Sequence, residues 1–405
     1  MIPYDYQIEL AKQAYAILAQ YALVYLACEE RTGKTLTALL VVNSCSNVSN
    51  VLVVTKKNAL EGWNKTTAAY AVNLKAKYTI INYHSISKLP KGYKPDLVIL
   101  DEAHNYISGY PKPSAMHAAL IPICFRKPII YISATPHAQG FQQLYHQLSL
   151  SSWSPWARFN NFYHWFEVYG VPTYTYLHNR EVKQYTVVKD EEVLASVSHL
   201  FVTKTRKELG FAYEPGDKVH LIALDKSTKK LYNTLSKDKV ATISCCGVQY
   251  QYLLDTVTKV RTALHMLEGG VAKIDRNYLV LDNREKIDYI LEEWGDKESV
   301  VIFYNYIAEE TKLRDAFKYA TILQATSFAE GIDLSSYETL IVYSQDFSTA
   351  RHTQRRARQA NKNRDTPIVV HFLLVENAVS QDVYTTVSIN KVNYVDSTYQ
   401  RKELI

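Results

Sequence analysis

The alternation between short apolar runs and longer polar or amphipathic stretches is the feature of this sequence that most restricts its fold. Five runs of mostly aliphatic or β-branched residues are candidate strands, at 21–27, 50–55, 78–83, 95–101 and 127–133. Helical patterns at 34–45 and 113–124 lie between them. Continuous apolar runs are typical of strands that a parallel sheet buries on both faces. The pattern therefore predicts an α/β unit made of βαβ steps.

A second series of the same kind follows residue 270. Its elements, in order, are helix 283–294, strand 299–305, helix 307–319, strands 321–326 and 338–344, helix 350–361 and strand 367–374. The stretch between the two series is dense in aromatic residues and helical patterns, and it contains three of the five tryptophans. We therefore expect two α/β lobes, 1–150 and 271–405, joined by a helical segment at 151–270.

The composition excludes few functions, but it indicates the cellular compartment of the protein. A formal charge of +6 is compatible with a polyanionic partner without requiring one. The five cysteines form no C-x-x-C pair, as expected for free thiols in a reducing compartment. We see no secretory pattern and no apolar run near the roughly 20 residues that span a bilayer. The sequence predicts a cytoplasmic protein without a membrane partner, and most of its 32 tyrosines are expected to be structural.

The stretch "CEERTGKT", Cys28–Thr35, ends like the phosphate-binding loop G-x-x-x-x-G-K-[ST]. Cys28 stands in place of the first glycine, and three charged residues follow it: Glu29, Glu30 and Arg31. An apolar strand precedes the loop and a helix follows, an order that aims backbone N–H groups at phosphates. Lys34 would contact the β- and γ-phosphates, and Thr35 would ligate Mg²⁺. The alternative is a surface turn with a fortuitous lysine.

The stretch "DLVILDEAH" is an apolar strand that ends in two acids. Ligands of open parallel sheets bind at the carboxyl ends of the strands, where Asp101 and Glu102 would lie. Asp101 suits coordination of Mg²⁺, and Glu102 suits orientation or deprotonation of a water molecule. The alternative is that the two acids only begin a helix.

Taken together, these motifs resemble those of superfamily 2 helicases and translocases of the DEAH-box type, over nearly the whole two-lobe core. The matching stretches are "YDYQ" with Tyr6-Gln7 (Q motif), "CEERTGKT" (I), "VLVVTKK" (Ia), Asp101–His104 (II), Ser133–Pro136 (III), "VIFYN" (IV), Glu330–Leu334 (V) and Gln354–Asn361 (VI). Looser matches, including "LEGWNK" and "LFVTKTRKELG", resemble the Swi/Snf-type DNA translocases. The resemblance implies two tandem RecA-like lobes in a compact core of the kind that phages carry.

The resemblance also implies an ATP-dependent DNA helicase or translocase that uses Mg²⁺ and acts on duplex or branched DNA, and it is compatible with a monomer. Its expected ATP-binding residues are Tyr6, Gln7, Arg31, Thr32, Gly33, Lys34, Thr35, Gly331 and Asp333. The expected catalytic residues are Lys34, Asp101, Glu102, Arg355 and Arg358, with the metal ion on Thr35 and Asp101. Alternatives are an RNA helicase, or a nucleotide-gated binding subunit with little turnover.

Further residues receive roles from the same resemblance. Coupling between the nucleotide and nucleic-acid sites is expected from His104, Ser133, Thr135 and Gln354. Nucleic-acid contacts are expected from Thr55, Lys56, Lys57, Tyr83, His84, Ser327 and Gly331. The aromatic residues Trp153, Trp156, Phe159 and Trp165 are expected in a core, with a duplex-separating wedge as the alternative.

Two departures from the family pattern concern arginines. Asn361 stands where motif VI usually has its second arginine, so either Arg355 and Arg358 form the pair or one is missing. Arg31 stands where the family usually has glycine. We expect ordinary negative φ at Arg31 with its side chain directed away from the β-phosphate. The alternative is a solvent-facing side chain paired with Glu29 or Glu30.

Overall fold

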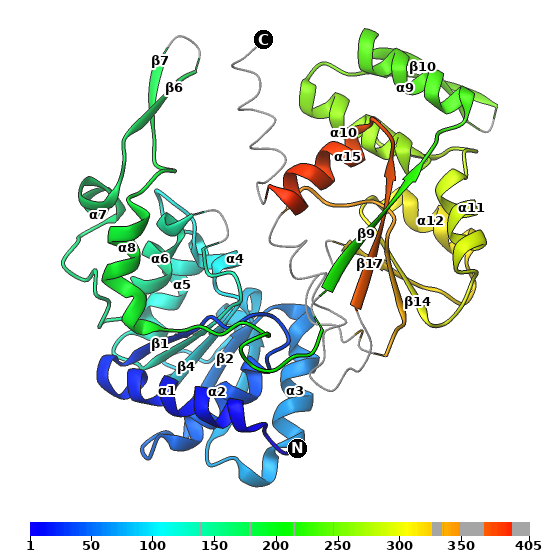
Figure 1. Ribbon diagram of the computed structural model, residues 1–405. Coiled ribbons are helices and arrows are strands. Elements are labelled where there is room, and N and C mark those ends of the chain that lie inside the picture. The colour runs from blue at the N-terminus through cyan, green and yellow to red at the C-terminus, as the bar shows by residue number, and fades with distance from the viewer. Residues whose placement is uncertain are drawn as a thin grey trace. The chain divides into compact units, whose positions relative to one another are not determined.

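A computed structural model of the chain describes residues 1–137, 140–177, 180–213, 215–245, 247–325, 334, 336–348 and 368–390. The chain divides into two compact units, Met1–Gly210 and Phe211–Ile405, each with its own parallel sheet (Figure 1). The predicted fold class, two tandem parallel-sheet lobes of the RecA-like kind, is confirmed. The stretch 151–270, which we expected as a separate linking segment, contributes residues to both units.

The first unit is built on a six-stranded parallel sheet with the order β3-β2-β4-β5-β1-β8. The strands are β1 (Leu23–Leu26), β2 (Asn50–Thr55), β3 (Lys77–Asn82), β4 (Leu97–Asp101), β5 (Ile129–Ile132) and β8 (Phe201–Val202). The helices are α1 (Asp5–Tyr21), α2 (Lys34–Ser44), α3 (Leu60–Ala69), α4 (His104–Ile107), α5 (Ala115–Cys124), α6 (Leu144–Leu148), α7 (Phe162–Tyr169) and α8 (Asp190–Val197). The five predicted strands correspond to β1–β5, and β8 adds an edge strand beside β1.

Tyrosine side chains lie inside this sheet because their hydroxyls find partners there. Tyr25 on β1 and Tyr131 on β5 are fully buried, and their rings stack with centroids 5.2 Å apart. The Tyr25 hydroxyl donates to Gln147 Oε1 at 2.8 Å, and that of Tyr131 donates to the Gln147 carbonyl at 2.7 Å. A buried hydroxyl without a partner would destabilise the fold, so Gln147 is part of the core.

The aromatic-dense stretch that follows the sheet mainly packs into the same core. Trp156 and Trp165 are buried, with ring centroids 5.2 Å apart, and Phe159 packs partly buried against the same cluster. Trp153 is 45% exposed. The expectation of core packing is confirmed for Trp156 and Trp165. Beyond this stretch, β6 (Thr173–Leu177) and β7 (Arg180–Gln184) form a hairpin that projects from the unit in Figure 1.

The second unit has a five-stranded parallel sheet with the order β15-β14-β16-β17-β9. The strands are β9 (Pro215–Ile222), β14 (Val300–Tyr304), β15 (Thr321–Gln324), β16 (Thr339–Val342) and β17 (Ile368–Val375). The helices α11 (Glu285–Glu293) and α12 (Ile307–Ala316) correspond to predicted helices, whereas the predicted helix 350–361 lies outside the described residues. The sequence did not predict β9, because as an edge strand it buries only alternate side chains, among them His220 and Ile222.

The same unit carries a hydrophobic cluster away from its sheet. It is made by α9 (Lys226–Asp238), the hairpin β10 (Val240–Cys245) and β11 (Val248–Leu253), α10 (Val257–Glu268), the hairpin β12 (Val271–Ile274) and β13 (Asn277–Val280), and α15 (Val379–Tyr384). We expected only helices in the part before residue 270, so the β10–β11 hairpin corrects that expectation. In neither unit does the described part contain a helix with the length and apolarity to cross a membrane.

Candidate nucleotide-binding site

Three neighbouring strands of the first unit bring the predicted motifs to one edge of the sheet. β1 leads into the loop at Cys28–Thr35, β4 ends at Asp101, and β5 ends just before Ser133. β5 pairs in parallel with both β1 and β4, so the carboxyl ends of all three strands lie side by side. This is where open parallel sheets bind ligands, and the three segments therefore define one candidate site.

The loop before α2 has a left-handed backbone at two positions. Gly33 has φ of 74°, and Arg31 has φ of 65°. Our expectation of negative φ at Arg31 is therefore wrong. A left-handed residue with a Cβ costs about 1–2 kcal/mol. The Thr32 hydroxyl holds this turn by donating to the Glu29 carbonyl at 2.8 Å, so a side-chain contact supports a backbone conformation that favours glycine.

Gln7 and Tyr6 on α1 contact this loop directly. Gln7 Nε2 donates to the Gly33 carbonyl at 3.3 Å, and Gln7 Oε1 accepts from the Tyr4 N–H at 2.9 Å. A Cβ at Gly33 would lie 2.0 Å from Gln7 Nε2, so the buried amide leaves no room for a side chain there. The Tyr6 hydroxyl donates to the Thr32 carbonyl at 3.2 Å, and burial raises the pKa of Tyr6 to about 12. The structure thus brings Tyr6 and Gln7 onto the loop backbone.

Lys34, the first residue of α2, directs its side chain back over the loop. Its Nζ donates to the carbonyls of Cys28 and Glu29 at 2.8 and 2.7 Å. The ammonium group therefore lies inside the curve of the loop, which suits a phosphate-contacting lysine. Thr35, the next residue of the helix, is half-buried.

The two acids of the loop pair with an arginine from the end of the unit. Arg206 Nε lies 3.7 Å from Glu29 Oε2, and Arg206 Nη1 lies 3.6 Å from Glu30 Oε2. The Arg206 backbone N–H also donates to Glu29 Oε2 at 2.8 Å. Glu29 and Glu30 thus both form ion pairs with Arg206, a residue outside the loop.

Asp101 is a buried carboxylate with one oxygen already engaged. Its Oδ2 accepts from the Thr55 hydroxyl at 2.6 Å and from the Trp63 indole N–H at 2.8 Å. No hydrogen bond from the described residues reaches Oδ1, so this oxygen is the one that suits a metal ion. Burial, with a further contribution from the Glu102 charge, raises the pKa of Asp101 to about 6.

Glu102, Ser133 and His104 form a directional chain of hydrogen bonds. Burial lowers the pKa of His104 to about 3, so its imidazole is neutral at physiological pH. Asn105 Nδ2 lies 2.9 Å from His104 Nε2, which must accept, so the proton is on Nδ1. His104 Nδ1 then donates to Ser133 Oγ at 2.9 Å, and the Ser133 hydroxyl donates to Glu102 Oε2 at 3.2 Å. The chain thus orients the Glu102 carboxylate. The Thr135 N–H also donates to Ser133 Oγ.

Other predicted residues have different surroundings. Thr55 and Tyr83 are buried, and their hydroxyls donate to the Asp101 carboxylate and the Asp101 carbonyl. They therefore build the site rather than a surface for nucleic acid, which corrects that expectation. Lys57 and His84 are exposed, and Lys56 is half-buried. The remaining predicted site residues lie outside the described part of the chain: Ser327, Gly331, Asp333, Gln354, Arg355 and Arg358.

Sequence reasoning assigned no role here to Trp63 or Arg206. Trp63 is the buried residue of α3, and a lone tryptophan in a mostly polar helix is a signal that can be found in a sequence. Arg206 lies about 170 residues after the loop, with a separation of 177 from Glu29. Only the fold brings such distant residues together, so no local pattern could have found this pair.

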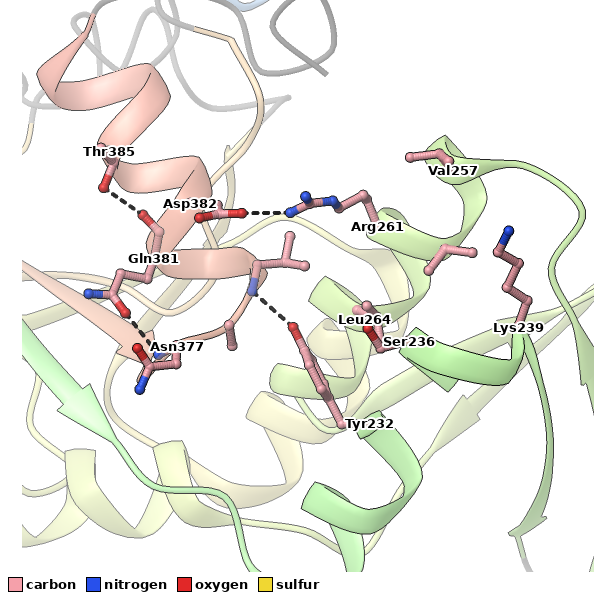
Figure 2. Close-up of a pocket in the computed structure, with 13 residues that line it drawn as sticks. Tyr232, Ser236, Lys239, Val257, Arg261, Leu264, Asn377, Gln381, Asp382 and Thr385 are labelled. Atoms are coloured by element: carbon pink, nitrogen blue, oxygen red, sulfur yellow. Dashed lines mark hydrogen bonds and ion pairs between the residues drawn. The ribbon is translucent and has the colours of Figure 1, made fainter. Parts of the chain in front are cut away.

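A cavity of about 660 Å³ lies in the second unit, between α9, α10 and α15 (Figure 2). Its polar groups largely satisfy one another. Arg261 Nη1 lies 2.6 Å from Asp382 Oδ2, and the Tyr232 hydroxyl accepts from the Val379 N–H at 3.0 Å. We therefore interpret the cavity, which Lys239 also lines, as a gap in the packing between these helices and not as a ligand site.

No protein-family model matches the chain, and no curated protein matches it in sequence. Among solved structures, the chain is similar to the Sulfolobus solfataricus SWI2/SNF2 ATPase core in complex with dsDNA. The identity is 14%, the TM-score is 0.45, and the match covers 95% of this chain and 90% of that one. The assignment of fold rests on the two parallel sheets themselves.

Proposed function

We propose that the chain is a nucleic-acid-dependent ATPase that couples hydrolysis in its first unit to movement along DNA, as a helicase or duplex translocase. The observation that carries this proposal is the meeting of Lys34, Asp101 and the Glu102–Ser133–His104 chain at one edge of a parallel sheet. A structural turn would need no lysine over the loop and no buried carboxylate with a free oxygen. A phosphate and metal site needs both.

Each of these residues has a role that follows from its contacts. Mg²⁺-ATP, when bound, supplies the transferable phosphoryl group and its counter-ion. Lys34 would release the loop carbonyls to contact phosphate oxygens, while Asp101 Oδ1 and Thr35 would hold the metal ion. Glu102 would orient the attacking water, because the Ser133 hydroxyl donates to Glu102 Oε2 and so fixes the position of the carboxylate. Arg355 and Arg358 stay the proposed sources of positive charge for the transition state, and Gly331 and Asp333 stay proposed nucleotide contacts.

The nucleic-acid part of the proposal is supported by a row of lysines on α9. Lys226, Lys229, Lys230 and Lys237 share one face at the helical period, opposite the buried Leu235. All four are exposed, and within the described residues none has an ion pair. We call these four residues the α9 lysine face. The α9 lysine face carries positive charge and includes no exposed apolar side chain. Such a face suits binding to a nucleic-acid phosphate backbone better than binding to a lipid surface.

The proposal is tested by measuring ATP hydrolysis with no nucleic acid, single-stranded DNA, duplex DNA and RNA, beside Lys34→Ala. Duplex-stimulated turnover that Lys34→Ala abolishes supports the DNA motor, and displacement of a triplex-forming strand would show movement along duplex. Stimulation by RNA alone would identify an RNA helicase. Tight ATP binding without turnover would identify a nucleotide-gated binding subunit. Absence of nucleotide binding would reject all three.

A further inference from the structure

The segment after β8 runs alongside the phosphate-binding loop. The Ala27 N–H donates to the Val202 carbonyl at 2.9 Å, and the Glu29 N–H donates to the Lys204 carbonyl at 3.0 Å. Cys28 Sγ lies 3.6 Å from the Val202 carbonyl oxygen. The loop is therefore fastened along its length to a segment that enters the sheet as its last strand, about 170 residues later in the chain.

Arg206 ends this contact with a cluster of charges. Its side chain is largely buried, at 10% exposed, and it faces Glu29 and Glu30, whose side chains are 38% and 14% exposed. Besides the two ion pairs, Arg206 Nη1 donates to the Glu30 carbonyl at 3.4 Å. One guanidinium thus contacts the side chains of both acids and the backbone of the loop itself. The fork of donors that arginine carries is suited to such a junction, whereas a lysine has a single ammonium group.

Two carboxylates in a loop that receives a triphosphate create an electrostatic problem. Like charges in a partly buried site repel, and removing the partner of a buried ion pair leaves an uncompensated charge. Arg206 compensates this charge on the side of the loop that faces β8. It also fixes the loop backbone through the Glu30 carbonyl, next to Arg31 with its left-handed φ.

We propose that Arg206 is a positioning residue for the phosphate-binding loop, which neutralises Glu29 and Glu30 and thereby allows a nucleoside triphosphate to bind. This inference rests on the proposed function, since it assigns Arg206 to the same nucleotide site. It explains why the loop of this chain can hold two acids, because their charge is balanced by a residue outside the motif.

The test compares Arg206→Gln with Lys207→Gln, which removes the same charge from an exposed neighbour in the same segment. Equilibrium binding of ATP, ADP and AMP is measured for each variant at constant ionic strength. Arg206→Gln is expected to weaken ATP binding roughly tenfold or more, ADP binding less and AMP binding least. Without Arg206 the carboxylates of Glu29 and Glu30 lose their ion pairs with it, and their negative charge repels each added phosphate. Lys207→Gln should bind all three like the parent. A loss of only local structure would instead weaken all three ligands equally.

Rescue gives the second readout. In the triple variant Glu29→Gln, Glu30→Gln, Arg206→Gln, the repulsion is absent, and ATP affinity should return to within about threefold of the parent. If Arg206→Gln alone does not fold, the test uses the double variant Glu29→Gln, Glu30→Gln, which retains Arg206. This double variant should bind ATP at least as tightly as the parent. Failure of rescue, weaker ATP binding by that double variant, or equal losses in Arg206→Gln and Lys207→Gln would overturn the inference. A parent protein that binds no nucleotide would instead overturn the proposed function.

Discussion

The Ser133 hydroxyl accepts a hydrogen bond from His104 Nδ1 at 2.9 Å and donates one to Glu102 Oε2 at 3.2 Å. This pair joins the end of β5 to the start of α4, so two motifs that are 29 residues apart share one chain of hydrogen bonds. Because burial lowers the pKa of His104 to about 3, its imidazole is neutral, and the chain of hydrogen bonds runs in one direction, from His104 to Glu102 as the final acceptor.

Ser133→Ala should lower the turnover number while leaving ATP affinity nearly unchanged. The variant removes the hydroxyl that accepts from His104 and donates to Glu102, and leaves the direct approach of His104 Nδ1 to Glu102 Oε2 at 3.3 Å. Alanine fits the fully buried position. We expect a loss of roughly tenfold to a hundredfold, the range for misplacing a group that orients water. Steady-state hydrolysis and equilibrium binding measure the two parts separately. A parallel loss of affinity would mean that Ser133 supports the loop instead.

Arg31→Gly should stabilise the first unit. Glycine adopts a φ of 65° without strain, which recovers about 1–2 kcal/mol, and its larger unfolded-state entropy offsets about 0.5–1 kcal/mol of that gain. Thermal unfolding of the parent and the variant measures the difference. Unchanged ATP affinity and turnover would limit Arg31 to a bystander role. An unstable variant would show that the side-chain contacts of Arg31 outweigh the backbone strain.

Metal-ion affinity should fall as the pH drops through about 6. Burial first, and the Glu102 charge second, raise the pKa of Asp101 to that value, so below it the carboxyl is protonated and cannot bind Mg²⁺. Each further pH unit should cost about tenfold in affinity. Titration of Mg²⁺ at several pH values checks this, and affinity should be flat above about pH 7.5. Asp101→Asn should bind the metal weakly at every pH, and a pH dependence that survives in this variant would assign it to another group.

The α9 lysine face should contribute to the salt dependence of DNA binding. Each lysine that neutralises a phosphate adds about 0.9 to the slope of log affinity against log salt, so Lys229→Gln with Lys230→Gln should lower the slope by roughly 2. Fluorescence anisotropy with a labelled duplex over a wide salt range measures it.

The control for this measurement is Lys297→Gln with Lys318→Gln, which removes the same charge from exposed positions elsewhere in the second unit. This pair should leave the slope of the parent unchanged. Equal slopes for both double variants would show that α9 only adds net charge. A parent slope near zero would contradict phosphate contacts of any kind.

The sequence was sufficient for the central strands of both parallel sheets, because buried strands have continuous apolar runs that can be detected locally, but it missed the edge strands β8 and β9. It also placed Lys34, Asp101 and Glu102 at one sheet edge, since parallel strands end together. Prediction from the sequence failed where the conformation of a residue depends on backbone geometry, as at Arg31. It also failed where the position of a side chain depends on partners that are distant in the sequence. Thr55 looked like a surface residue after a strand, yet Asp101 draws its hydroxyl into the core. The partnership of Glu29 with Arg206 depends on β8 closing beside β1, which no local pattern encodes.

The indole of Trp63 touches the carboxylate that we propose to hold the metal ion. An indole emits light whose wavelength and yield change with the hydrogen bond and the charge at its N–H. Trp63 is 2% exposed, so quenchers dissolved in the solvent reach it poorly. The chain therefore contains its own optical probe of Asp101, and occupation of the site can be followed in unlabelled protein, in real time, against the background of four other tryptophans.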